Sequence, residues 1–148
     1  EAKLASDADF AKDGNARLTI SLDSVETLIP IRNERMREML FETVTFPTAT
    51  VSATVAPELV ASLAGGAAVD TDLTFTLALH GVEKSFTVPV VVTAEKSGGL
   101  QVFTPAPVIV NAVDFGLQAG VAALQSVAGL KAISTAVPVS VHLVFKPL

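Results

Sequence analysis

The chain has 148 residues, which indicates one domain spanning residues 1–148 with room for a sizeable core. Half of these residues are hydrophobic, led by Ala and Val with eight Phe and no Trp or Tyr, a composition that favours a sheet and either deep burial or an apolar cavity. A net charge of −5 without a basic face argues against nucleic-acid binding, and the lack of Cys excludes disulfides and thiolate chemistry.

A strand, a short helix and a helical turn are predicted in the first half of the chain. Apolar and polar residues alternate over residues 17–22, which is typical of a half-buried strand. Over about residues 33–41, two methionines and a leucine share one face at spacings of three and four, so a short helix is predicted there. The alternation returns over residues 50–55, and Pro57 then opens a helical turn through Leu63.

A β-hairpin is predicted around the pair His80-Gly81. Apolar residues occupy every second position over residues 73–79, and the same alternation continues over residues 86–92. A two-residue connection joins antiparallel neighbours, because parallel strands need a long crossover between them. The predicted sheet is therefore antiparallel.

The remaining predicted elements are a bent strand, an Ala-rich helix and a closing strand. Leu100 to Val110 is predicted as one strand, in which two prolines indicate an edge, a bulge or a bend. Residues 116–128 are predicted as a less regular helical stretch, because several glycines interrupt them. The chain then closes with an alternating strand over residues 139–146.

Four short motifs follow one another in the first third of the chain: Ser24-Val25-Glu26-Thr27, Arg32-Asn33-Glu34-Arg35-Met36-Arg37, Leu40-Phe41 and Phe46-Pro47-Thr48-Ala49. In this order they resemble the YceI-like family of small bacterial barrels. The hairpin Asp72–Val88 and the segment Asn111–Gly116, which ends in Asp-Phe-Gly, extend the resemblance over residues 16–148. The chain departs from the family pattern at Asn33, where many members have Asp, and at Ala112, where Arg is frequent.

The resemblance implies a mostly β fold, an antiparallel lipocalin-like β-barrel with one or two short helices. Members usually carry one or two strands before the segment that matches Ala16–Leu22, whereas only residues 1–15 precede it in this chain. About six strands are predicted in the rest of the chain, and a closed barrel needs about eight. We therefore expect residues 1–15 to add at most one short strand. The barrel would then be incomplete at the N-terminus, with an open edge or one covered by a partner or a dimer mate.

The resemblance also implies a function, because family members are thought to bind long apolar molecules outside the cytoplasm, chiefly polyisoprenoids. We predict a non-enzymatic periplasmic or secreted protein, without cofactor or metal, that carries or sequesters an apolar, chain-like lipid in a barrel tunnel. The chain begins Glu1-Ala2-Lys3 without a signal peptide, as a mature processed chain or a cytosolic one would. The alternative is a structural or protein-interaction domain with a filled core.

The predicted ligand site consists of apolar residues on the inward phases of the strands and of phenylalanines elsewhere in the chain. These residues are Leu73, Phe75, Leu77, Leu79, Phe86, Val88, Val90, Phe103, Phe115, Val141, Leu143, Phe145, Phe41 and Phe46. An apolar inward phase is compatible with a tunnel and with a filled core. The many small side chains fill volume poorly, which favours the tunnel.

Catalytic and metal-binding interpretations have weaker support in the sequence. Asp70 and Asp72 could form a carboxylate pair for acid/base chemistry, but their place at the start of a strand favours solvated turn residues. His80 and His142 are too few for a metal site, and we interpret His80 as serving the turn and His142 as facing outward. No Gly-x-Ser-x-Gly motif indicates a hydrolase nucleophile.

Three arginines are clustered in the predicted first helix. Arg32, Arg35 and Arg37 could bind an anionic head group such as a diphosphate. Nearby glutamates would neutralise them, so we favour salt bridges between this helix and the barrel rim over a head-group site.

Overall fold

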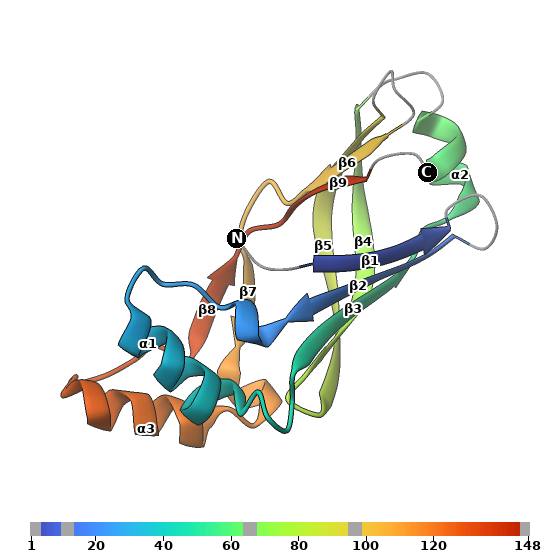
Figure 1. Cartoon of the computed structure of the whole chain (residues 1–148). Coiled ribbons are helices and arrows are strands. Elements are labelled where there is room, and N and C mark those ends of the chain that lie inside the picture. The colour runs from blue at the N-terminus through green and yellow to red at the C-terminus, as the bar shows by residue number, and fades with distance from the viewer. Residues whose placement is uncertain (1–3, 10–13, 64–67, 95–98, 146–148) are drawn as a thin grey trace.

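The computed structural model describes residues 4–9, 14–63, 68–94 and 99–145 (Figure 1). The strands are β1 (Leu4–Asp9), β2 (Asn15–Ser21), β3 (Thr48–Thr54), β4 (Ala68–Leu79), β5 (Val82–Ala94), β6 (Leu100–Phe103), β7 (Val108–Asn111), β8 (Ala136–Val139) and β9 (His142–Phe145). The helices are α1 (Pro30–Arg35), α2 (Pro57–Ser62) and α3 (Gln118–Ala128). Shorter helical pieces are η1 (Leu22–Ser24), the π-helix η2 (Met36–Phe41) and η4 (Ala112–Phe115).

The main sheet is antiparallel and has seven strands in the order β1-β2-β3-β4-β5-β6-β9. It curls into a half-barrel with α2 at one end and with α1 and α3 at the other (Figure 1). The edge strands β1 and β9 do not pair with each other in the described part of the chain. The predicted mostly β, antiparallel fold is confirmed, and residues 4–9 supply the one short strand expected before β2.

The hairpin of β4 and β5 is long, and it forms where the alternation predicted it. Its pairing runs from Ala68 opposite Thr93 to Leu79 opposite Val82. The two turn residues both have positive φ, 52° for His80 and 76° for Gly81. Left-handed backbone at both central positions matches the right-handed twist of the flanking strands, which explains why a two-residue turn suffices.

The first predicted helix begins earlier than expected, at Pro30, because proline is favoured at the first helical position. It widens into the π-helix η2 and ends at Glu42, whose φ of 49° is left-handed. The predicted Ala-rich stretch forms α3, which ends at Gly129 with φ 63°. Among the helices of the described residues, none has the length and apolar character needed to cross a membrane.

Two predicted strands are each divided in the structure. Pro105 and Pro107 lie in the bend between β6 and β7, where proline removes ladder donors. The closing strand was predicted as continuous, which is wrong, because Val139 belongs to β8 and pairs with Val108 in a separate two-stranded sheet. Thr104 and Val141 link the two bends through a hydrogen bond from Thr104 N to Val141 O (3.0 Å) and one from Val141 N to Thr104 Oγ1 (3.0 Å).

Candidate functional site

One face of the main sheet is apolar from strand to strand, and we call it the inner wall. Register aligns one row through Ala16, Ala53, Phe75 and Phe86, and other rows repeat this pattern across the sheet. The inner wall comprises Ala16, Leu18, Ile20, Ala49, Val51, Ala53, Val69, Leu73, Phe75, Leu77, Leu79, Phe86, Val88, Val90, Val92, Leu100, Val102, Leu143 and Phe145.

The inner wall is shielded from water only in part. Ala49, Val90 and Val92 are buried, whereas the other wall residues are half-buried. The opposite face of the same strands is polar at many positions. Thr74, for example, is exposed and shares a hydrogen bond with Thr87 across the hairpin. The sheet therefore has one solvated face and one apolar face that retains contact area for something else.

Two apolar contacts close the ends of the inner wall. At the α2 end, Leu63 is 3% exposed and packs with Val90 and Val92. At the α3 end, Phe115 is fully buried and belongs to a cluster with Ala112, Leu117 and Val121. Half-buried wall residues pack against both plugs, with Leu77, Leu79 and Phe86 at the α3 end and Val69, Leu73 and Val88 at the α2 end.

Phenylalanine rings connect the inner wall to the plug at the α3 end. The ring of Phe75 stacks on that of Phe86 with centroids 5.4 Å apart, and Phe86 stacks on Phe115 at 6.5 Å. The local sequence positions Phe115, because Asn111 Oδ1 accepts a hydrogen bond from Val113 N and Gly116 ends the turn with φ 70°. This is a structural role for the Asn111–Gly116 segment.

The structure brings most of the predicted ligand-site residues together. Those on the inner wall are Leu73, Phe75, Leu77, Leu79, Phe86, Val88, Val90, Leu143 and Phe145, and Phe115 packs against it. Phe103 pairs with Val91 on the opposite face, where its ring meets His142 edge-on at 6.4 Å. Val141 lies in the bend between β8 and β9, which removes it from the ladder of either sheet.

The last two predicted residues lie near the helical end. Phe41 closes η2. The ring of Phe46 packs on that of His80 with centroids 4.2 Å apart, under the hairpin turn. Neither residue belongs to the paired strands of the inner wall.

Sequence reasoning missed several residues of the inner wall. It omitted Leu18, Ile20 and Val51 from the site, although the same alternation that identified β4 and β5 was visible in their strands. It also omitted Leu100 and Val102, which alternate in the same way on β6 before the bend at Pro105. Applying the period-two pattern to every strand would have found them.

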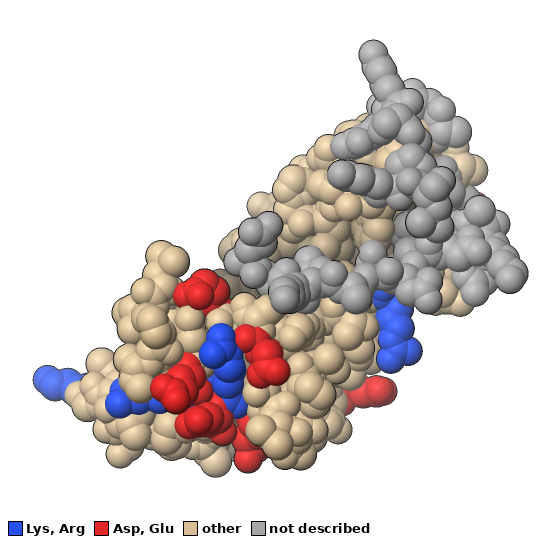
Figure 2. Space-filling model, viewed as in Figure 1, with Lys and Arg blue, Asp and Glu red and all other residues tan. Residues whose placement is uncertain are grey.

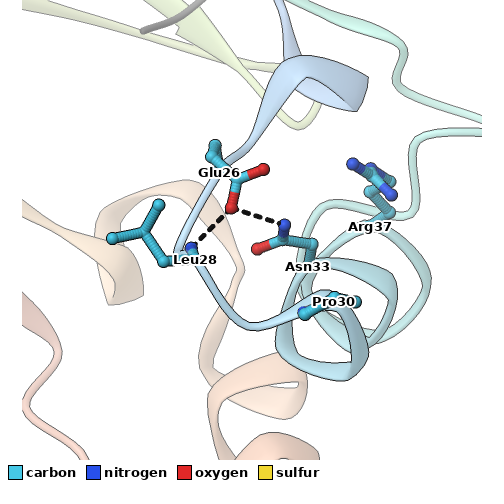
Figure 3. Close-up of a pocket in the computed structure, with 5 residues that line it drawn as sticks. All are labelled: Glu26, Leu28, Pro30, Asn33 and Arg37. Carbon is cyan, nitrogen blue, oxygen red and sulfur yellow. Dashed lines mark hydrogen bonds between the residues drawn. The ribbon is translucent and has the colours of Figure 1, made fainter.

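A polar network at the rim joins the start of α1 to the loop before it (Figure 3). The buried Asn33 accepts hydrogen bonds at Oδ1 from Thr27 N (2.8 Å) and from Thr27 Oγ1 (2.6 Å). Its Nδ2 donates to Glu26 Oε1 at 2.9 Å, and the same carboxylate oxygen accepts from Leu28 N. Asn33 thus both accepts hydrogen bonds from the loop and donates one to it.

Electrostatics at this rim favour an ionised Glu26. The hydrogen bond from Asn33 is the largest cause that lowers the pKa of Glu26, followed by the backbone hydrogen bond from Leu28. Arg37 also lowers this pKa by its charge, and it lines the same shallow surface pocket as Pro30 (Figure 3).

Arg37 connects η2 to the backbone of the rim. Its Nε donates to Asp23 O at 2.8 Å and its Nη2 to Val25 O at 3.4 Å. The sequence predicted salt bridges between the arginine cluster and the barrel rim. Arg37 does contact the rim, but the acceptors of its two hydrogen bonds are backbone carbonyl oxygens. Two guanidinium nitrogens of Arg37 therefore hold η2 against the backbone of the rim.

The histidines and carboxylates lie away from the middle of the inner wall. His80 Nε2 lies 2.8 Å from Glu42 Oε2 beside the hairpin turn, and His142 is exposed on the outer face of β9. Asp70 and Asp72 are exposed on the outer phase of β4. Within the described ranges, no three His, Asp or Glu side chains gather as metal ligands would.

Comparisons with known proteins identify related sequences and structures. A family model described as the YceI-like domain matches residues 1–145. Among solved structures, the chain is similar to a polyisoprenoid binding domain from Saccharophagus degradans implicated in plant cell wall breakdown, with 34% sequence identity and a TM-score of 0.87. That similarity covers 98% of this chain and 92% of the other.

Two more distant structures share the fold. BcnA from Burkholderia cenocepacia is 22% identical with a TM-score of 0.68, and the match covers 97% of this chain and 83% of BcnA. The YceI protein of Campylobacter jejuni is 16% identical with a TM-score of 0.63, and the match covers 100% of this chain and 82% of that one. A comparison with curated proteins found no match.

Proposed function

Because the chain belongs to the YceI-like domain family, we propose that it binds an apolar, chain-like lipid such as a polyisoprenoid against its inner wall. The protein would carry or sequester this lipid without reacting with it. The observation that supports this proposal most directly is that Leu73, Phe75 and Val88 on the inner wall stay half-buried, although Leu73 and Val88 already pack against the plug at the α2 end. Each methylene that a ligand buries there contributes about 0.8 kcal/mol, so a long chain gains affinity in proportion to its length.

The chemistry of the inner wall suits a ligand without polar groups along its length. Lys84 faces this side at the hairpin end, and its ammonium group is paired with the carboxylate of Asp114. Thr71, opposite Val90, is a second polar position on this side. The other wall positions on β2 to β6 and on β9 carry aliphatic or aromatic side chains, which select apolar surface by area and impose little chemical specificity. This supports binding of a chain of repeated hydrocarbon units.

We extend the proposal to a role outside the cytoplasm. It rests on the resemblance of the Ser24–Ala49 motifs to a family of extracytoplasmic proteins, and on a composition without Cys that oxidising conditions would not alter. Cell fractionation with antibodies against the chain tests it, and recovery in the cytosol alone would exclude it.

An alternative function is a structural or protein-interaction domain. The observation that favours it is the pair of sheet edges at β1 and β9, which do not pair with each other among the described strands. Unpaired edge strands can accept a strand from another chain. A second copy of this chain is one such partner, and analytical ultracentrifugation would detect the resulting dimer.

Native mass spectrometry of the full chain incubated with a long-chain polyprenol tests the proposed function. We expect one bound polyprenol on the wild type and at least a tenfold loss of binding in Val88→Trp, because the larger ring occupies the middle of the inner wall. Thr87→Trp is the matched control, since Thr87 directly precedes Val88 on β5 and is exposed on the opposite face. No uptake by the wild type, or equal uptake by both variants, would reject the lipid site.

A further inference from the structure

Large aliphatic side chains are exposed at the end of the molecule where α1 begins and α3 ends. We call this set the aliphatic tip, and it comprises Leu28, Ile29, Ile31, Val127 and Leu130. Leu28 is 90% exposed and Leu130 is 52% exposed. No residue of α3 carries a charge, which is unusual for a surface helix of 11 residues.

Helix packing explains why the two halves of the aliphatic tip lie at the same end. A Cβ atom on Gly120 would be 2.5 Å from Met39 O and 2.8 Å from Leu40 Cα, so the start of α3 lies directly on the end of η2. From this contact, α1 and η2 run back in the opposite direction to α3 (Figure 1). The first residues of α1 and the last residues of α3 therefore lie at the same end of the molecule (Figure 1).

The backbone at Leu28 is held in an unfavourable conformation that keeps its side chain in solvent. Leu28 has a φ of 63°, which is rare for a residue with a branched bulky side chain. Glu26 accepts the hydrogen bond from Leu28 N, and Asn33 holds Glu26 in place. Such strain persists only where surrounding contacts enforce it, and it occurs often at functional sites.

Charges of both signs lie near the aliphatic tip, and two exposed cations directly follow its side chains. The anionic Glu26 is engaged by Leu28 N and Asn33 in the rim network, and Glu34 lies further along α1. Arg32 follows Ile31, and Lys131 follows Leu130, and both side chains are exposed. In Figure 2 the outermost charged atoms over the end of α3 are blue, whereas the red atoms lie nearer to the sheet. Aliphatic side chains with cations directly behind them complement the acyl and phosphate layers of a bilayer.

We propose that the aliphatic tip docks the protein on a phospholipid bilayer. Leu28, Ile31 and Leu130 would enter the acyl boundary while the neighbouring cations meet lipid phosphates. The proposal builds on the proposed function, because a carrier of an insoluble lipid must collect it from a membrane. A second copy fits the tip less well, since a two-fold contact would bring the same cations toward each other.

Co-sedimentation of the full chain with phosphatidylcholine vesicles, with and without phosphatidylglycerol, tests the docking. We expect the wild type to pellet with both, and more strongly with the anionic lipid. Leu28→Asn combined with Ile31→Ser should lower the bound fraction at least tenfold, and Asn tolerates the left-handed backbone at residue 28. Val44→Ser is the matched control, because Val44 is fully exposed beyond the opposite end of η2. Thermal melting establishes that each variant is folded.

The outcomes separate docking from lipid binding. A wild type that stays in the supernatant with both vesicles, or tip variants that pellet like wild type, overturns the docking proposal. A wild type that dimerises through the tip in analytical ultracentrifugation, without binding vesicles, also overturns it. Loading with polyprenol from detergent is measured in parallel by native mass spectrometry. Loading without vesicle binding rejects docking alone, and vesicle binding without loading rejects the proposed function alone.

Discussion

Among single residues, Glu26 connects protonation to the stability of the rim. Its folded pKa lies below the ordinary value of 4.5, chiefly because of the hydrogen bond from Asn33. Such a group stabilises the fold above the unfolded pKa, and this stability is lost as the pH falls through the folded pKa. We expect the free energy of unfolding of the wild type to fall more steeply than that of Glu26→Gln between about pH 6 and pH 3.

Urea unfolding across this pH series measures the effect. Glu34→Gln is the control, because Glu34 is an exposed carboxylate on the neighbouring helix α1 and lies outside the rim network. Its profile should follow that of the wild type. Equal slopes for wild type and Glu26→Gln would show that the ionised carboxylate does not support the fold.

Asn33 is the other single residue whose replacement is informative. Asn33→Ala leaves Thr27 N without its acceptor, and we expect a loss of about 1–3 kcal/mol in the free energy of unfolding. Asn33→Asp keeps the acceptor but places a second carboxylate against Glu26. The deficit of Asn33→Asp relative to wild type should therefore shrink as the pH falls and one carboxyl of the pair is protonated. A deficit that is constant with pH would argue against this geometry.

The hairpin of β4 and β5 is the element that depends most clearly on its turn. Gly81 has a φ of 76°, and a Cβ there would lie 3.2 Å from the Phe46 ring. We expect Gly81→Ala to lower the free energy of unfolding by more than about 1 kcal/mol. Gly129→Ala is the matched control, because Gly129 also has positive φ but no atom within 4 Å of an added Cβ. If Gly129→Ala is equally damaging in urea unfolding, then the Phe46 contact contributes nothing.

The contact between α3 and η2 is a second test of an element. Gly120→Ala should improve the intrinsic helix propensity of α3 by about 1 kcal/mol. The added Cβ would meet the backbone of Met39 and Leu40, so we expect a net destabilisation of about 1–3 kcal/mol. Ser126→Ala on the exposed part of the same helix reports the propensity effect alone. Stabilisation by both variants, measured by thermal melting, would mean that the helices can separate without loss.

For the whole molecule, ligand binding and stability should be linked. A ligand that binds only the folded chain raises the free energy of unfolding by about 2.7 kcal/mol at one hundred times its dissociation constant. We expect a long-chain polyprenol to raise the melting temperature of the wild type and of Thr87→Trp, and to leave that of Val88→Trp unchanged. A polyprenol that shifts none of these melting temperatures would contradict binding to the inner wall.

The helices could be predicted from the sequence, but their packing could not. The residues that form α2 and α3 were recognisable from Pro57 and from the Ala-rich run, because such signals are local. The sequence did not show that Leu63, after α2, and Phe115, before α3, are buried against the sheet. Their burial depends on contacts between segments far apart in the chain. The rim network escaped prediction for the same reason, since an asparagine shows no sign in sequence of which hydrogen bonds it makes.

The sequence by itself determined strands β2 to β5, the hairpin turn and the apolar face, because alternation with period two and turn preferences act between near neighbours. Family motifs further identified the fold from the same residues. Tertiary structure alone decided that the strands over residues 100–110 and 139–145 divide between two sheets, and that Phe103 lies on the outer face. It also decided that the inner wall remains half-buried, because solvent access depends on how far the sheet curls and on which helices reach its ends.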